Sequence, residues 1–233
     1  YKGTRKPMPE ELREQVPLMK EALQTMNIPI LTLEGYEADD ILGTVAKHCQ
    51  AEGIEVSIVS GDRDLLQLAD EHIKIRIPKT SRGTTNIYDY YPDDVKREYQ
   101  VTPTEFIDVK ALMGDTSDNI PGVPGIGEKT AVQLLQEYTT LDSIYEHISD
   151  IKPTVAKKLE AGKESAYMSK EVAEIWCDAP ITMDLDAMDA NDLDTGRLAS
   201  LLKELEFSSL VKRLPKNMQK QATSAPAVTG QSN

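Results

Sequence analysis

Residues 114–130 constrain the fold of this chain more than any other segment. They read GDTSDNIPGVPGIGEKT, with glycine at 114, 122, 125 and 127 and proline at 121 and 124. Such a run excludes a helix or strand interior, so we expect a turn-rich hairpin here. From residue 128 to residue 138 the spacing turns helical. Backbone N–H groups at the start of that helix would favour an anion such as phosphate.

The first part of the same stretch has the composition of a cation site. Asp115 and Asp118 stand three positions apart, and the residues around them are threonine, serine and asparagine. These oxygen donors suit a hard cation such as Mg²⁺. The segment therefore offers a metal site beside a phosphate-binding site, and the density of special residues favours this interpretation over an ordinary surface turn.

A second acidic cluster lies at the start of the helix predicted over residues 37–50. Glu37, Asp39 and Asp40 fall in its first turn, where acids favour the helix dipole. The dipole alone does not explain why they adjoin the apolar edge of the helix, where unpaired charge is costly. A metal-binding role is the alternative.

A third cluster follows the strand predicted over residues 54–59. Asp62 and Asp64 come directly after that apolar run, at the carboxyl end of the strand. Sites in parallel α/β sheets form at this end, so the pair is another candidate. An aspartate nucleophile of the haloacid-dehalogenase-like phosphatases is a competing interpretation, but it explains neither residues 37–40 nor the glycine-rich hairpin.

The three clusters together would bring seven carboxylates into one place. Like charges at that density require cations. Two divalent ions would meet this need and would support phosphoryl transfer to water. The formal net charge of −13 does not exclude a DNA partner, because basic residues cluster elsewhere, but it predicts local, metal-dependent binding.

The remaining pattern predicts helices, a few strands and a polar tail. Helices are expected over 9–26 with a kink or break at Pro17, and over 91–99, 102–113, 141–148, 153–160, 163–176 and 195–213. The segment Thr102-Pro103-Thr104-Glu105 predicts a capping box with proline at the first helical position. Strands are expected over 28–33, 73–77 and 86–88, with a polar loop over 79–85. Residues 216–233 indicate a linker. No apolar run reaches the length of a membrane span, and the two cysteines suit a reducing compartment.

Three motifs carry a resemblance: EADD at 37–40, SGDRDL at 60–65 and GDTSDNIPGVPGIGEKTA at 114–131. In this order they resemble the 5′-nuclease domain of bacterial DNA polymerase I, within the flap endonuclease family. The resemblance implies an α/β fold with a PIN-like (resolvase-like) partial parallel sheet, followed by an all-helical domain of the helix-hairpin-helix type. It divides the chain into a helical-arch remnant (1–27), a nuclease core (28–100), a DNA-binding domain (101–213) and a flexible linker (214–233).

The resemblance also assigns roles to particular residues. It implies metal ligation, by two Mg²⁺ or Mn²⁺ ions, for Glu37, Asp39, Asp40, Asp62, Asp64, Asp115 and Asp118. It implies that the arch places catalytic Lys2 and Arg5 by the scissile phosphate. It implies DNA contacts by Tyr1, Lys2, Arg5, Lys6, Gly122, Gly125, Gly127, Lys129 and Thr130, with K⁺ at the hairpin.

The activity implied is 5′→3′ exonuclease and 5′-flap cleavage, in Okazaki fragment processing and DNA repair. The implied setting is a monomeric protein of the bacterial cytoplasm, associated with the nucleoid, with polymerase domains downstream. The chain begins with Tyr1, and the family's first strand and two further acids would lie upstream. We therefore expect the fragment to be inactive and poorly folded alone. A DNA-structure-binding module without chemistry is the alternative.

Overall fold

The structure is a computed structural model that describes residues 7–186 and 195–213. Backbone contacts divide the chain into two compact units. Leu33–Ile181 forms the described part of the first unit, and residues 7–32, 182–186 and 195–213 form that of the second. No helix in these described ranges is both long and apolar enough to cross a lipid bilayer.

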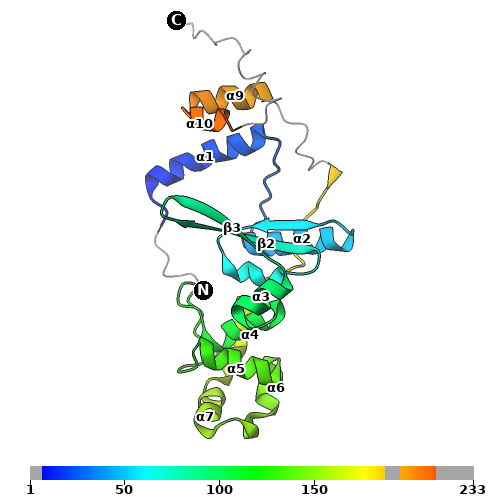
Figure 1. The fold of residues 1–233 in the computed structure, drawn as a ribbon, viewed down its shortest axis with the longest axis vertical. Coiled ribbons are helices and arrows are strands. Elements are labelled where there is room, and N and C mark those ends of the chain that lie inside the picture. Colours follow the sequence, from blue (N-terminus) through cyan, green and yellow to red (C-terminus); the bar gives the residue numbers. More distant parts are fainter. Residues whose placement is uncertain (1–6, 187–194, 214–233) are drawn as a thin grey trace, which may run out of the picture. The chain divides into compact units, whose positions relative to one another are not determined.

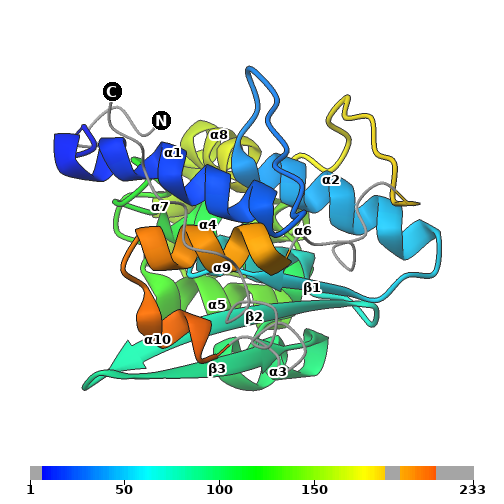
Figure 2. The ribbon, with the colours of Figure 1, turned by 90° about the horizontal axis from the view of Figure 1, so that it is seen from above.

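The first unit contains a three-stranded sheet in the order β1-β2-β3 (Figure 2). β1 (Val56–Val59) pairs with β2 (Ile73–Ser81) in parallel, and β2 pairs with β3 (Thr84–Tyr90) in the antiparallel sense. α2 (Ala38–Ala51) packs against β1. The alternating isoleucines of β2 are buried, as their period of two predicts. This mixed sheet confirms the expected α/β class with a partial parallel sheet.

Two expectations about strands are wrong. Residues 79–85 are mostly strand, because threonines continue the β2–β3 pairing and only Arg82 and Gly83 form the turn. Both have positive φ, of 50° and 79°, which suits the tight turn of a twisted hairpin. Residues 28–33 form no strand. Pro29 lacks an N–H donor, and this segment pairs with no strand in the described part of the chain.

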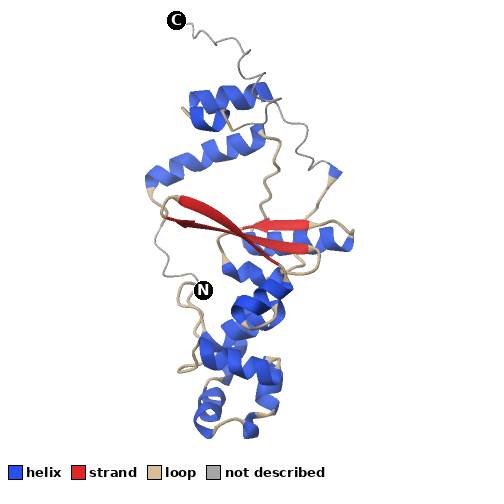
Figure 3. Ribbon diagram, viewed as in Figure 1, coloured by secondary structure: helices blue, strands red, loops and turns tan. Residues whose placement is uncertain are grey.

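Beyond β3 the described part of the first unit is helical (Figure 3). Its α-helices are α3 (Pro92–Tyr99), α4 (Pro103–Met113), α5 (Glu128–Tyr138), α6 (Leu141–Glu146), α7 (Pro153–Ala161) and α8 (Lys163–Ala173). The 3₁₀ helix η2 (Ile148–Asp150) lies between α6 and α7 in the sequence, whereas the other 3₁₀ helix, η1 (Arg63–Leu68), comes earlier, between β1 and β2. α4 packs against η1, α5 and α8, so it joins the sheet-bearing part to the helical part (Figure 1).

Local sequence explains where α4 starts. Thr102 accepts a hydrogen bond from the Glu105 backbone N–H at 3.3 Å, and the Glu105 carboxylate accepts one from the Thr102 N–H at 2.7 Å. Pro103 occupies the first helical position, where its missing N–H costs nothing. The predicted capping box is therefore confirmed, and it sets the start of the helix that leads into residues 114–130.

The second unit contains α1 (Glu10–Thr25), α9 (Thr195–Glu204) and α10 (Ser208–Val211). α1 is one element through Pro17, so of the kink or break expected there the break does not form. The helix predicted over 195–213 is interrupted at Glu206, whose φ is 59°. An apolar groove of about 610 Å³ lies among these helices, with Leu12, Met19 and Phe207 about half exposed.

Candidate metal centre

Residues 114–123 form a closed loop fastened to the end of α4. Asp115 and Ile120 exchange backbone hydrogen bonds of 2.9 and 2.8 Å, and the Val123 N–H donates to the Leu112 carbonyl at 2.7 Å. Gly114 and Gly122 have positive φ and meet backbone to backbone. A Cβ on Gly122 would lie 2.3 Å from the Gly114 nitrogen, so only glycine fits. The loop therefore couples the two predicted acids rigidly to the hairpin.

Three carboxylates, one from η1 and two from this loop, meet at one point. Asp64, on η1, and Asp115 and Asp118, in the loop, each offer an oxygen within 4.8 Å of the others. Asp118 is 6% exposed, which is unusual for a carboxylate. Oxygens at this mutual separation match the ligand set of one Mg²⁺, Mn²⁺ or Ca²⁺ ion.

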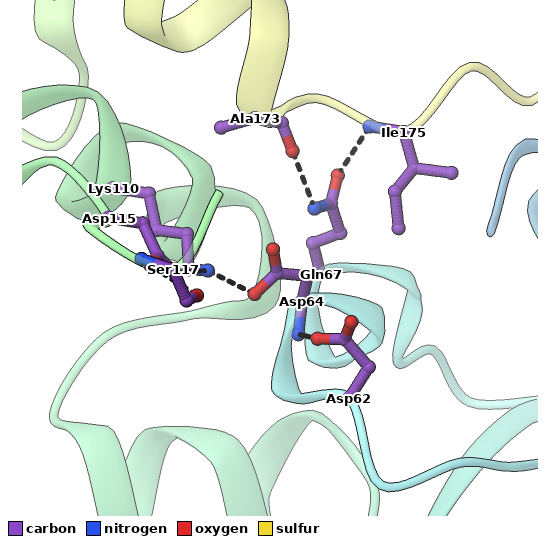
Figure 4. Close-up of polar contacts among 8 residues, drawn as sticks. All are labelled: Asp62, Asp64, Gln67, Lys110, Asp115, Ser117, Ala173 and Ile175. Atoms are coloured by element: carbon purple, nitrogen blue, oxygen red, sulfur yellow. Dashed lines mark hydrogen bonds and ion pairs between the residues drawn. The ribbon is translucent and has the colours of Figure 1, made fainter. Parts of the chain in front are cut away.

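A buried lysine, which the sequence did not single out, lies against this cluster. Lys110 of α4 donates to Asp115 Oδ2 at 2.7 Å and also to Asp64 Oδ1, and its side chain is 8% exposed (Figure 4). In the sequence, the only indication of its role is its place among the apolar residues of the helix predicted over 102–113. A lysine buried there needs a partner of opposite charge.

Burial and the contacts between Lys110 and the two aspartates shift the pKa values of all three groups. Burial works to lower the pKa of Lys110, but the hydrogen bonds to Asp115 and Asp64 outweigh it and raise that pKa. Burial works to raise the pKa of Asp115, but hydrogen bonds from Lys110 and Ser117 dominate and lower it to about 2. For Asp64 burial prevails, and its pKa is raised despite the ion pair.

The other predicted acids lie around the same centre. Glu37, Asp39 and Asp40 line a cavity of about 290 Å³ together with Asp64. Asp62 lines a second cavity, of about 580 Å³, with Asp64, Lys110 and Asp115. Asp64 belongs to both cavities, so the structure brings the three acidic segments to adjoining sites.

Two of these acids also serve the backbone. Asp40 accepts hydrogen bonds from the Glu37 N–H and the Trp176 N–H, both at 3.0 Å. Asp62 accepts one from the Asp64 N–H at 3.0 Å and so begins η1 (Figure 4). Helix capping therefore explains part of why these acids are here, although each carboxylate retains lone pairs for a cation.

A buried glutamine, also missed in the sequence, holds one wall of the first cavity. The Gln67 amide donates to the Ala173 carbonyl at 3.0 Å and accepts from the Ile175 N–H at 2.9 Å (Figure 4). Ala173 is the last residue of α8 and Ile175 lies two residues beyond it, and both line the cavity. Gln67 thus ties this wall to η1, the element that carries Asp64.

The hairpin at residues 122–130 is hydrogen-bonded to α7 and α8, and several of its residues are exposed. Ser169 accepts from the Gly122 N–H at 3.0 Å, and Ser165 donates to the Gly122 carbonyl at 2.6 Å. Lys158 donates to the Gly125 carbonyl at 3.0 Å. Gly127 begins α5 without a side-chain cap. The side chains that could reach a ligand here include that of Lys129, which is exposed, whereas Thr130 is half-buried.

The predicted arch residues lie outside the described part of the chain. They are Tyr1, Lys2, Arg5 and Lys6.

Two family models match consecutive parts of the chain. The 5′-3′ exonuclease N-terminal resolvase-like domain matches residues 1–100, and the 5′-3′ exonuclease C-terminal SAM fold matches residues 101–196. DNA polymerase I of Caldicellulosiruptor bescii is 44% identical over 214 residues, which are 92% of this chain and 25% of that protein. DNA polymerase I of Bacillus caldotenax is 46% identical over 92% of this chain and 24% of its own length. The chain thus spans about a quarter of these curated relatives.

Solved structures agree on the architecture. The T5 D15 protein co-crystallized with metal ions has a TM-score of 0.59 at 25% identity, covering 88% of this chain and 74% of that one. The catalytic core of Rad2 in complex with DNA substrate has a TM-score of 0.54 at 16% identity, covering 85% and 65%, and shows the fold alone. The chain therefore belongs to the 5′-3′ exonuclease family, as a resolvase-like domain followed by a SAM-fold domain like those of bacterial DNA polymerase I.

Proposed function

We propose that this chain is the 5′-nuclease part of a DNA polymerase I, which hydrolyses phosphodiester bonds at 5′ ends and 5′ flaps during Okazaki fragment processing and repair. The observation that carries the proposal is the meeting of acids from separated segments at one centre. That centre is joined to an open glycine hairpin by two close-packed glycines.

The residues present fit a divalent cation. Asp64, Asp115 and Asp118 supply only oxygen donors, which Mg²⁺ and Mn²⁺ prefer, and they would hold the first ion. Glu37, Asp39 and Asp40 line one adjoining cavity and Asp62 lines the other, and we propose that these acids complete the ligand set of two ions. When bound, such ions supply the Lewis acidity and the activated water that phosphodiester hydrolysis requires.

The hairpin would grip the DNA backbone. Gly127 begins α5 without a side-chain cap, so the first-turn N–H groups can bind a phosphate. Lys129 adds a cation on the exposed side. We assign phosphate contacts to Gly125, Gly127, Lys129 and Thr130, with K⁺ as a further ligand of this loop. Gly122, which was expected to contact DNA, is buried, and its N–H already donates to Ser169.

The remaining assignments are also proposals. Tyr1, Lys2, Arg5 and Lys6 would face the single-stranded flap, with Lys2 and Arg5 acting on the scissile phosphate. The four-part division at residues 27, 100 and 213, the monomeric state and the association with the bacterial nucleoid rest on the same family relationship.

The proposal is tested with the full-length protein and a labelled 5′-flap DNA. We expect cleavage with Mg²⁺, none with chelator, and none from Asp118→Ala. Asp93→Asn, an exposed carboxylate on α3, is the control and should retain cleavage. Flap binding that survives Asp118→Ala, without cleavage by the wild type in any divalent metal, would instead establish a DNA-binding module.

A further inference from the structure

Lys110 is the only basic residue among those buried in the described part of the chain. It stands on α4, which is fixed by its capping box at one end and by the Gly114–Gly122 contact at the other. Its ammonium group reaches two carboxylates of the acidic centre, Asp64 and Asp115 (Figure 4). A buried ammonium is stable only with such partners, so the placement is specific.

The oxygens that Lys110 occupies are ones a metal ion would need. Asp115 Oδ1 accepts from the Ser117 N–H at 2.8 Å and from the Ser117 hydroxyl at 2.6 Å, and Oδ2 accepts from Lys110 at 2.7 Å. Lys110 also binds Asp64 Oδ1. Both oxygens of Asp115 are thus engaged, and an incoming ion must share or replace the ammonium contact.

The structure also provides space for the lysine to leave. Lys110 lines the cavity of about 580 Å³ that adjoins the cluster, together with Tyr99, Phe106 and Met113. A lysine side chain is a flexible four-carbon stem that can turn toward such a space. Like charge drives it there, because an ammonium and a divalent cation repel one another at the same carboxylates.

We propose that Lys110 is an internal counter-cation that competes with the divalent metal for Asp64 and Asp115. Without metal it holds the two carboxylates together and neutralises part of their repulsion. When metal binds, the ammonium withdraws from the carboxylate oxygens. Lys110 is on this view a positioning residue that weakens metal affinity while keeping the empty centre folded. This inference rests on the proposed metal-dependent function.

The test measures Mn²⁺ affinity by isothermal titration calorimetry on the full-length protein. Binding that Asp118→Asn abolishes is assigned to the acidic centre. We expect Lys110→Met to lower the Mn²⁺ dissociation constant of that centre roughly tenfold or more. Lys110→Arg keeps the charge and should stay near the wild-type value. Lys110→Gln replaces the methionine variant if that variant fails to fold.

Lys170→Met is the matched control. It removes a lysine on the adjacent helix α8 that pairs, at 2.8 Å, with Asp108, another buried carboxylate on α4. It should leave Mn²⁺ affinity unchanged. Three results would overturn the inference: unchanged or weaker affinity in Lys110→Met, equal tightening in Lys170→Met or Lys110→Arg, or no Mn²⁺ binding that depends on Asp118.

Flap cleavage in the same preparations separates this inference from the proposed function. Tighter Mn²⁺ binding in Lys110→Met with no cleavage by the wild type would leave the role of Lys110 standing and reject the nuclease. Cleavage by the wild type with unchanged affinity in Lys110→Met would do the reverse.

Discussion

Replacing Gly122 with alanine should release the acidic centre from the hairpin. Gly122 has a φ of 61°, and this left-handed conformation costs an L-residue about 1–2 kcal/mol. The new Cβ would lie 2.3 Å from the Gly114 nitrogen and 2.6 Å from the Met113 carbonyl carbon. Because both are backbone atoms, relief requires a backbone shift, and overpacking of this kind costs about 1–3 kcal/mol. The sum is about 2–5 kcal/mol.

Hydrogen–deuterium exchange, read by mass spectrometry on the full-length protein, measures this loss locally. The reporters are the amides of Asp115, Ile120 and Val123, which are hydrogen-bonded inside the loop. A loss of about 2–5 kcal/mol should accelerate their exchange by about 30-fold to several thousand-fold. Peptides from β2 should exchange as in the wild type.

Gly127→Ala is the matched control in the same hairpin. Gly127 has a φ of −99°, and a Cβ there would meet nothing within 4 Å. We expect a cost below about 1 kcal/mol, from the less favourable helix cap alone. Equal exchange in the two variants, or unchanged protection of residues 115–123 in Gly122→Ala, would refute the close-packing argument.

Three further outcomes follow from the structure. Gln67→Leu leaves the Ala173 carbonyl and the Ile175 N–H without their partner, so denaturant titration should show a loss of about 2–4 kcal/mol of stability, and a loss below about 0.5 kcal/mol would contradict this. Asp115 has its pKa lowered to about 2, so its contribution to stability is present above pH 4 and is lost as the pH falls toward 2. Acid titration of metal-free Asp115→Asn should lack that component, and an unchanged acid transition would count against it. Thr102→Ala removes the cap of α4, so chemical denaturation should show a loss of about 0.5–2 kcal/mol in the free energy of unfolding. Thr104→Ala, two residues later and inside the first turn, should cost less.

Local patterns account for what could be predicted from the sequence. The capping box at Thr102, the helix that starts after Gly127 and the alternating isoleucines of β2 each depend on neighbours a few residues away. The candidate acids were also identifiable, because three clusters of carboxylates stand at a helix start, after a strand and in a glycine-rich loop. The strand predicted over residues 28–33 is wrong, because a strand needs a hydrogen-bonding partner and local composition does not reveal whether one exists.

The assembly of the acidic centre depends on contacts between residues that lie far apart in the sequence. Lys110 meets Asp64 across 46 positions of sequence, and Gln67 meets Ala173 across 106. No periodicity encodes such pairs, because they form only after packing has removed both groups from water and made an unpaired charge or amide costly. Residue types and their spacing were enough to identify the candidate metal-binding acids and the glycine-rich loop that follows two of them. The fold determined which oxygens meet, that a lysine already neutralises two of them, and that Gly114 and Gly122 hold the loop in place through backbone contact no side chain would permit.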